Sequence, residues 1–468
     1  LVNSVTLFLA IFSFLELGVG SVVQSSLYKP LAENDSDSVS GIIVSANKFF
    51  RLLALILAVY IGFLIAFYPK FIHSASSFSF FYVVGLILAM SISFFAQYYF
   101  GVVDRLLLLA AQKGYVSYIA QTVTLCLSTA VCVILIKTGA GIQTVKLAGS
   151  LIYLLRPIYL RLYVNKHYRI NRRIRYEGEP IKQKWNGVAQ HVAAVVLDNT
   201  DTVVLTVFST LSNVSIYSVY HLVINGVKTL FTSMTGGIQA LLGELWAKQE
   251  LDELKKTFSW AEWLIHTGAV LVFGCTSSLV SPFVKVYTDG ITDADYHVPL
   301  FAFLLTLANS MHSLRLPYSI MILAGGHYKQ TQSNYIIAAV MNLAVSILAV
   351  RSLGLIGVAI GTLAAMLFQT VWMAHYVSRT FLRRPAKEFV KHLLVDAVCF
   401  AAAYGLTSLL RLKSVSYLSW VVLAVECAAI WLGVIAAVNF AAYPAFLKDI
   451  TGILKKRIGK AARAVIKK

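Results

Sequence analysis

Long apolar stretches recur along the whole chain and constrain its fold more than any other feature. Each is about 18–26 residues long, the length that an α-helix needs to cross a bilayer. In hydrocarbon the backbone must satisfy its own hydrogen bonds, so only helices and closed barrels can span it. The stretches lack the alternation over about ten residues that marks a barrel strand. With 58% hydrophobic and only 13% charged residues, the chain is predicted to be an all-α polytopic membrane protein.

The stretches divide into thirteen expected spans, and a further helix is expected between two of them. The segment 243–259 mixes charges with leucine and tryptophan, which predicts a surface helix between two spans. The spans are expected at 2–27, 49–67, 78–100, 115–136, 144–164, 188–208, 214–240, 263–280, 298–323, 334–350, 355–377, 392–410 and 417–440.

Basic residues set the expected orientation. The loops on one side and the C-terminal tail carry 29 of the 40 lysines and arginines, whereas the opposite loops carry seven. The richer side is predicted to be cytoplasmic, which places the C-terminus inside. The formal net charge of +19 is thus explained by topology, and no nucleic-acid partner is expected. Because the same pattern puts Leu1 outside, at the start of a span, we expect a native chain one helix longer, with fourteen spans.

Two segments resemble each other and predict an internal duplication. Gly18–Asp37 and Gly236–Lys255 each start at a glycine, leave the membrane at an aliphatic–aromatic pair and continue into an acidic stretch. They lie 218 positions apart with six spans between them, so both copies point the same way, as in parallel repeats. The expected domains are residues 1–185 and 186–378 as two lobes, 379–445 as two extra helices, and 446–468 as a basic amphipathic tail. The tail suits an anionic inner leaflet, or simply retains the C-terminus inside.

Two stretches resemble a known family. LELGVGSVVQSSLYKPLAENDSD and NTDTVVLTVFSTLSNVSIYSVYHLVINGVKTLFTSMTGGIQALLGELWAKQE are similar to the polysaccharide-flippase branch of the multidrug/oligosaccharidyl-lipid/polysaccharide exporter superfamily. The likeness extends through the span count, and it departs at the N-terminus, where the family has one more helix. The resemblance implies two six-helix lobes around a central cavity that opens to either side in turn. It also implies a polyprenyl-pyrophosphate-linked oligosaccharide as substrate, moved from the inner to the outer leaflet.

Polar residues inside two consecutive spans form the first candidate site. Charges at membrane depth are costly and usually face a cavity or a partner. The second of these spans bears a stripe that lines either a cavity or a neighbouring helix. Asp198 and Asp201, in the preceding span, either pair with Lys228 or bind a coupling proton or sodium ion. The stripe recurs at helical spacing and comprises Ser218, His221, Asn225, Lys228, Thr232 and Thr235.

Three basic residues within spans form the second candidate. Arg156, Lys228 and Arg315 are predicted to line a cationic cavity, since arginine can grip a pyrophosphate with two parallel hydrogen bonds. The alternative is that each pairs locally with an acid such as Asp104, Asp198 or Glu16. Glu16 shares a helix face with Gly20 and Gln24 and is itself a candidate for an ion pair or for ion coupling. Two more acids, Glu262 and Asp396, lie near cytoplasmic ends of spans and are expected to be solvated.

These observations predict a bacterial inner-membrane flippase. The sequence contains no phosphate-binding loop, metal-ligand spacing or nucleophile motif, so no enzymatic activity and no cofactor is expected beyond a coupling ion. The expected partners are the polyprenyl-pyrophosphate oligosaccharide, membrane lipids, and a polysaccharide polymerase with its glycosyltransferases. The alternatives are a cation-coupled drug antiporter, whose cavity would be dominated by acids, and a membrane polymerase or glycosyltransferase, which would need a larger external loop.

Overall fold

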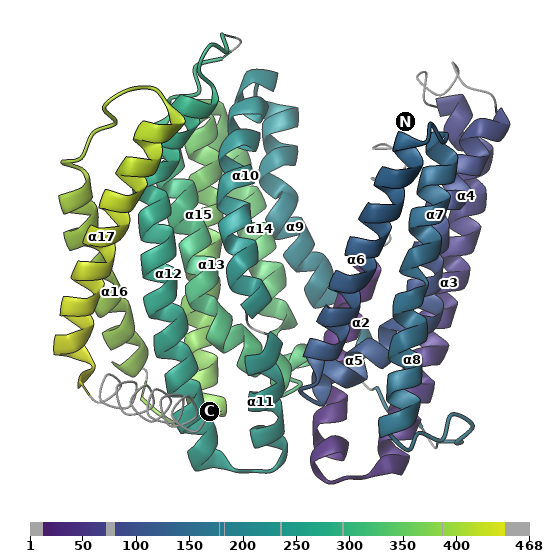
Figure 1. The fold of residues 1–468 in the computed structure, drawn as a ribbon. Helices are drawn as coiled ribbons and strands as arrows, with labels where there is room; N and C mark the ends of the chain where they lie inside the picture. The colour runs from purple at the N-terminus through teal and green to yellow at the C-terminus, as the bar shows by residue number, and fades with distance from the viewer. Residues whose placement is uncertain are drawn as a thin grey trace, which may run out of the picture. The chain divides into compact units, whose positions relative to one another are not determined.

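The chain folds into α-helices throughout the part that the structure, a computed structural model, describes. That part comprises residues 13–71, 80–176, 178–181, 183–234, 236–292, 294–385 and 387–444. The predicted amphipathic tail, residues 446–468, lies outside it. The helices (Figure 1) are α2 (Ser13–Ala32), α3 (Ser36–Phe71), α4 (Phe80–Ala96), η2 (Gln97–Gly101), α5 (Val102–Ala110), α6 (Gly114–Lys137), α7 (Ile142–Tyr153), α8 (Leu155–His167), α9 (Lys184–Phe208), α10 (Leu211–Met234), α11 (Gly236–Ala247), α12 (Leu251–Tyr287), α13 (Pro299–Ala324), α14 (Tyr328–Leu353), α15 (Leu355–Thr380), α16 (Lys387–Thr407) and α17 (Tyr417–Ala442).

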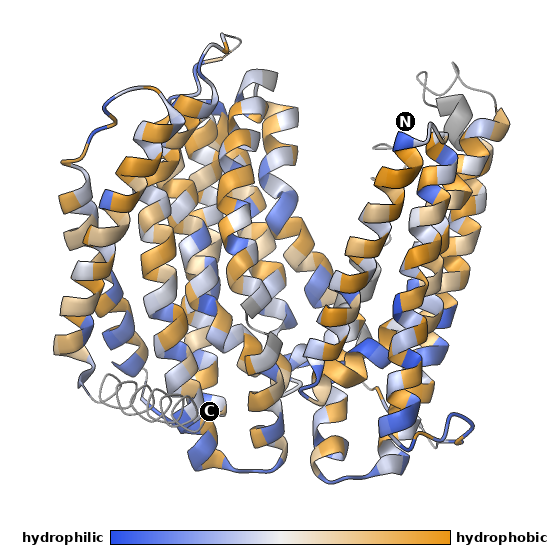
Figure 2. Cartoon of the chain, viewed as in Figure 1, coloured by the Kyte–Doolittle hydropathy of each residue, from blue (hydrophilic) through white to orange (hydrophobic). Residues whose placement is uncertain are grey.

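Ten helical segments in the described residues are long and apolar enough to cross a membrane. Two of them are composite: α4, η2 and α5 form one 31-residue segment, and α7 with α8 forms another of 26 residues. Together with α2, α10 and α13, the ten correspond one to one with the expected spans. Large apolar side chains are exposed along the helices, for example Leu222 and Leu348, and Figure 2 shows apolar residues along most of the helices. The predicted polytopic helical fold is confirmed.

One expected boundary is wrong. The span expected at 214–240 is covered by α10 and the start of α11, on either side of residue 235, which lies outside the described residues. The surface helix expected at 243–259 does not form, because its first residues close α11 and its last ones open α12, which continues to Tyr287. Of the apolar residues that suggested a surface helix, Leu245 and Leu254 are buried, and Trp246 and Leu251 are half-buried.

The span expected at 78–100 is longer than its hydropathy indicated. It continues as a helix to Ala110, and it therefore includes Arg105, which the sequence places in a cytoplasmic loop. A charged residue near the end of an apolar run looks like a boundary whether it enters water or turns back into the protein.

Turns between helices recur in the two halves of the chain at a nearly constant offset. Each half of the chain contains turns closed by a residue with positive φ. The turn residues of the second half follow those of the first at offsets of 214 or 215 positions, not at the 218 read from the sequence. The pairs are Asn34 and Gln249, Gln112 and Gly326, and Gly139 and Gly354.

The helices group into two compact units. Unit 1 comprises residues 1–195, 236–250 and 321–333, and unit 2 comprises residues 196–235, 251–320 and 334–468. In unit 1, the glycines of α2 and α11 allow close contact: a Cβ atom at Gly243 would overlap the ring of Tyr28. In unit 2, the two C-terminal helices are anchored on α12, where the ring of Trp431 fills the space that a side chain at Gly274 would need. Such contacts between a small residue and a large one suit helices that pack in lipid.

Candidate functional site

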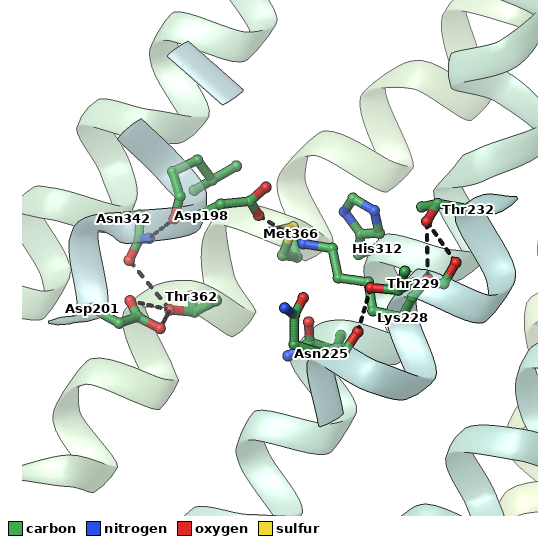
Figure 3. Close-up of polar contacts among 12 residues, drawn as sticks. Asp198, Asp201, Asn225, Lys228, Thr229, Thr232, His312, Asn342, Thr362 and Met366 are labelled. Atoms are coloured by element: carbon green, nitrogen blue, oxygen red, sulfur yellow. Dashed lines mark hydrogen bonds and ion pairs between the residues drawn. The ribbon is translucent and has the colours of Figure 1, made fainter. Parts of the chain in front are cut away.

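Lys228 and Asp198 form an ion pair within unit 2. The Lys228 Nζ atom donates to Asp198 Oδ1 at 2.8 Å, linking α10 to α9 (Figure 3). The ammonium side chain is only 14% exposed, whereas the carboxylate side chain is 46% exposed. Of the two aspartates that could pair with Lys228, the structure thus selects Asp198. The pair is partly exposed, so a change of partner needs no disruption of the core.

The rest of the α10 stripe is exposed or half-buried. The hydroxyl groups of Ser218 and Thr232 donate to backbone carbonyls of their own helix, at 2.8 Å and 3.2 Å. Asn225 is exposed, and the half-buried ring of His221 stacks on Tyr217 with 5.2 Å between the centroids. Thr235 lies outside the described residues. The stripe therefore presents polar atoms to its surroundings from most of its length.

Asp201, one turn along α9 from Asp198, lies in a different environment. It is 3% exposed. Thr362 Oγ1 lies 2.7 Å and 2.8 Å from its two oxygens, and the Tyr217 hydroxyl lies 3.3 Å away. Each hydroxyl has one proton to donate, whereas a carboxylate can accept about four hydrogen bonds. In the part of the chain that the structure describes, no basic side chain forms an ion pair with Asp201, so its negative charge is left to neutral donors: Thr362, Tyr217 and Asn342.

Close packing of α14 on α15 places Thr362 beside Asp201. A Cβ atom at Gly361 would overlap Ser346 Oγ of α14, and one at Gly357 would lie 2.5 Å from the Ala349 carbonyl oxygen. The glycine pair, four residues apart, thus lets the two backbones approach as in small-residue helix contacts. Asn342 of α14 completes the group: its Nδ2 atom donates to the Leu197 carbonyl at 3.2 Å, and its Oδ1 atom accepts from Ser346 at 3.0 Å.

Arg315 is a buried cation on α13. It is 6% exposed, and its Nη2 atom donates to His312 Nδ1 at 2.8 Å. Its other near neighbours are the Met366 sulfur atom, at 4.0 Å, and the ring of Tyr335, 5.9 Å from the guanidinium carbon. Nε has no hydrogen-bond partner, and among the described residues no carboxylate forms an ion pair with the guanidinium. A buried charge in a protein is normally paired with an opposite charge. Arg315 is therefore an unusual group, which an anion would stabilise.

Glu262 and Asp396 are buried, and the expectation that they are solvated is wrong. Glu262 is fully buried; it accepts from Tyr318 at 2.6 Å and pairs with Arg384 at 2.5 Å. Asp396 lies 2.6 Å from Nδ1 of His266, a buried residue on the same helix as Glu262. The network joins α12 and α13 to α16 and the segment before it. The burial of these acids is therefore explained by ion pairing that stabilises the attachment of the C-terminal helices.

The other two sequence candidates lie in unit 1. The Arg156 Nη2 atom, on α8, donates to Ser117 Oγ of α6 at 3.3 Å. Glu16 lies in α2, and its side chain is outside the described part. Asp104, offered as a possible partner for Arg156, instead binds Arg161 at 3.3 Å and Arg172 at 3.2 Å. Since Arg156 belongs to unit 1 and Lys228 and Arg315 to unit 2, a single cavity lined by all three stays a prediction.

Sequence reasoning missed several members of these groups. Asn342, Ser346 and Thr362 are polar residues in apolar helices, and their spacing could have been noticed. Arg105 and Arg384 give no such signal, because each follows the end of an apolar run, like the loop residues from which the orientation is predicted. The pairing of Arg384 with Glu262 spans 122 positions, a distance over which no local pattern carries information.

Comparison with solved structures identifies the fold. The chain is similar to the Vibrio cholerae MATE transporter VcmN in its bent form, with a TM-score of 0.66 and 13% identity over 82% of this chain and 88% of that one. A MATE transporter in complex with MaD3S gives a TM-score of 0.64 and 14% identity, over 80% and 86% of the two chains. An outward-facing multidrug resistance MATE family transporter of the MOP superfamily gives 0.61 and 15%, over 81% and 88%. Neither a family model nor a curated protein matches the sequence. The chain thus has the fold of the MATE transporters.

Proposed function

We propose that this protein is an exporter that works by alternating access and flips polyprenyl-pyrophosphate-linked oligosaccharides across a bacterial inner membrane. The fold supports a transporter of this kind, because the similar solved structures are MATE transporters, one of them in an outward-facing conformation. The substrate is argued from the charges of the chain itself.

The substrate class is inferred from the environment of Arg315. Its guanidinium is buried, keeps an unsatisfied Nε atom and forms no ion pair with a described carboxylate. The contact with His312 Nδ1 adds no negative charge, because a guanidinium only donates hydrogen bonds, and that ring nitrogen must then accept. An anionic substrate supplies the missing counter-charge, and a pyrophosphate presents oxygens that match the arginine fork.

Asp201 is the proposed coupling site for a proton or a sodium ion. A buried carboxylate with neutral donors alone is poorly stabilised as an anion. It can gain a proton, in which case Thr362 Oγ1 accepts from it and redirects its own proton to the Val358 carbonyl oxygen, 3.2 Å away. It can equally hold a sodium ion with the surrounding oxygens. Asp198 is assigned the other role, the ion pair with Lys228.

The second candidate is a cation-coupled drug antiporter. The similar structures favour it at least as well as the flippase, because one of them is a multidrug resistance transporter. A site for cationic drugs needs an acid accessible to the substrate, and Asp198, at 46% side-chain exposure, is a candidate within the helices of unit 2. Lys228 neutralises that acid in this structure, which is why we place the antiporter second.

A reconstituted transport assay separates the two candidates. The full chain in proteoliposomes is offered a pyrophosphate-linked oligosaccharide lipid and, separately, a lipophilic cationic dye, with an imposed proton or sodium gradient. We expect the glycolipid to be transported and the dye to be ignored. Transport of the dye with no movement of the glycolipid would establish the antiporter instead. Asp201→Asn should abolish the dependence of transport on the ion gradient, because the amide can neither release a proton nor balance a sodium ion.

A further inference from the structure

The C-terminal helices cover one face of α12. In unit 2, α16 and α17 lie against this helix (Figure 1). His266 Nδ1 of α12 lies 2.6 Å from Asp396 Oδ2 of α16. We call this surface of α12 the covered face. Its residues recur at helical spacing, and each contacts α16 or α17: Trp263, His266, Thr267, Val270, Gly274 and Ser278.

The helix α3 is the repeat equivalent of α12. The turn before α3 has its positive-φ residue at Asn34, and the turn before α12 has one at Gln249, 215 positions later. Each helix starts two residues after that turn residue, and the two helices are 36 and 37 residues long. The offset of 215 therefore aligns the two helices residue by residue.

The equivalent face of α3 is exposed. We call it the open face, and its three aliphatic side chains are 54–69% exposed. Two basic residues, also exposed, precede them. The open face comprises Lys48, Arg51, Leu52, Leu55 and Val59, at the positions of Trp263, His266, Thr267, Val270 and Gly274.

The open face lacks the features by which the covered face binds a helix. On α12, Gly274 leaves space for the ring of Trp431, and the Thr267 hydroxyl donates to a side chain of α17 at 3.4 Å. On α3 the glycine position is Val59 and the threonine position is Leu52, so the space is filled and the donor is lost. A surface that contacts acyl chains needs neither close backbone approach nor interhelical hydrogen bonds. The open face therefore suits lipid better than a helix.

The basic end of the open face favours an anion. Arg51 stands where His266 meets a carboxylate, and Lys48 lies one turn before it. Among the described residues, no carboxylate forms an ion pair with either. The Arg51 guanidinium carbon lies 5.1 Å from the centre of the Tyr99 ring, a contact that orients the charge without neutralising it. Both bases lie in the first half of α3, towards the end predicted to be cytoplasmic, where the bilayer surface is anionic.

We propose that the open face binds an anionic phospholipid of the predicted cytoplasmic leaflet. Lys48 and Arg51 bind the phosphate, and an acyl chain lies along Leu52, Leu55 and Val59. The phosphate takes on α3 the place that the carboxylate of α16 takes on α12. This site goes beyond the proposed function, because it concerns a lipid that stays in the membrane and holds whatever the transported substrate is.

Native mass spectrometry of the purified full chain in a neutral detergent measures its affinity for phosphatidylglycerol. A basic residue near an anionic lipid contributes a factor of about five to binding. We expect Lys48→Gln and Arg51→Gln each to weaken the affinity about fivefold and the double variant about thirtyfold. The matched control is Lys166→Gln, at an exposed lysine in the last turn of α8, in the same unit, and it should leave the affinity unchanged. Wild-type affinity in the double variant would overturn the proposal, and so would an equal loss of affinity for phosphatidylcholine.

Photo-crosslinking identifies the occupant in a bilayer, and it needs no charge substitution. The full chain carries a photoreactive benzoylphenylalanine in place of the exposed Leu55 and is placed in nanodiscs of equal parts phosphatidylglycerol and phosphatidylcholine. We expect adducts with phosphatidylglycerol to exceed those with phosphatidylcholine at least fivefold. Equal labelling of the two lipids would overturn the anionic site. In cell membranes, an adduct with a polypeptide would show that a helix covers α3, and the lipid proposal would then be wrong.

Discussion

Replacing Glu262 by glutamine should destabilise unit 2 far more than its position near a helix end suggests. Glu262 is fully buried and accepts from the Arg384 guanidinium and the Tyr318 hydroxyl. Removing the negative charge leaves Arg384, whose side chain is 10% exposed, with the half-exposed Glu388 as its remaining acid at 3.1 Å. Removing one partner of a buried ion pair costs about 3–5 kcal/mol, because the other charge stays buried and uncompensated.

Unfolding of the purified protein in mixed micelles, titrated with dodecyl sulfate, measures this cost as a free energy of unfolding. The matched control is Glu388→Gln, which removes an acid from the same arginine at an exposed position and should cost under about 1 kcal/mol. The double variant Glu262→Gln with Arg384→Met should recover much of the lost stability, because neither charge is then left alone. Equal small effects of Glu262→Gln and Glu388→Gln would refute the view that a buried ion pair anchors the C-terminal helices.

Three further outcomes follow from particular contacts. Lys228→Ala should impair transport, and adding Asp198→Asn should restore it, because Lys228 pairs with Asp198. Adding Asp201→Asn instead should not restore transport, and a rescue by that substitution would contradict the pairing. Gly361→Ala should lower the free energy of unfolding, because its Cβ would overlap Ser346, while Gly433→Ala, in open space on α17, should be neutral or raise it by up to about 1 kcal/mol. A cysteine at position 172 should resist membrane-impermeant labelling in intact cells, and its ready labelling from outside would reverse the predicted orientation.

The sequence predicted the helices well because burial in lipid imposes one requirement on every span. A helix in hydrocarbon needs a long apolar run whatever its neighbours are, so local hydropathy is sufficient. The polar stripe of α10 could be predicted for the same reason, since its periodicity is local. The π-helical turn at residues 97–101 gave no comparable signal, because tertiary packing decides where such a turn forms.

The charged residues were harder to place. A lysine or arginine at the end of an apolar run has the same appearance whether it enters water or turns inward. Arg105 is therefore wrongly predicted to lie in a loop, and Arg384, which does lie between α15 and α16, gives no sign that its side chain is buried. The structure brings Arg105 to a cavity and Arg384 to Glu262. Likewise, the sequence could not choose between Asp198 and Asp201 as the partner of Lys228, because three residues along a helix correspond to a small change in direction. Only the packing of α15 against α9 distinguishes them.

The most direct test of the central claim is the rate at which proteoliposomes containing Arg315 variants flip a pyrophosphate-linked oligosaccharide lipid. Arg315→Ala should reduce the rate to that of protein-free vesicles, because the buried cation that attracts the pyrophosphate is gone. Arg315→Lys should retain part of the activity, since it keeps the charge and loses the bidentate contact. The matched control is Arg351→Ala, an exposed arginine in the last turn of α14, and it should flip normally. Wild-type flipping by a folded Arg315→Ala protein would contradict the claim that a buried guanidinium recognises the anionic substrate.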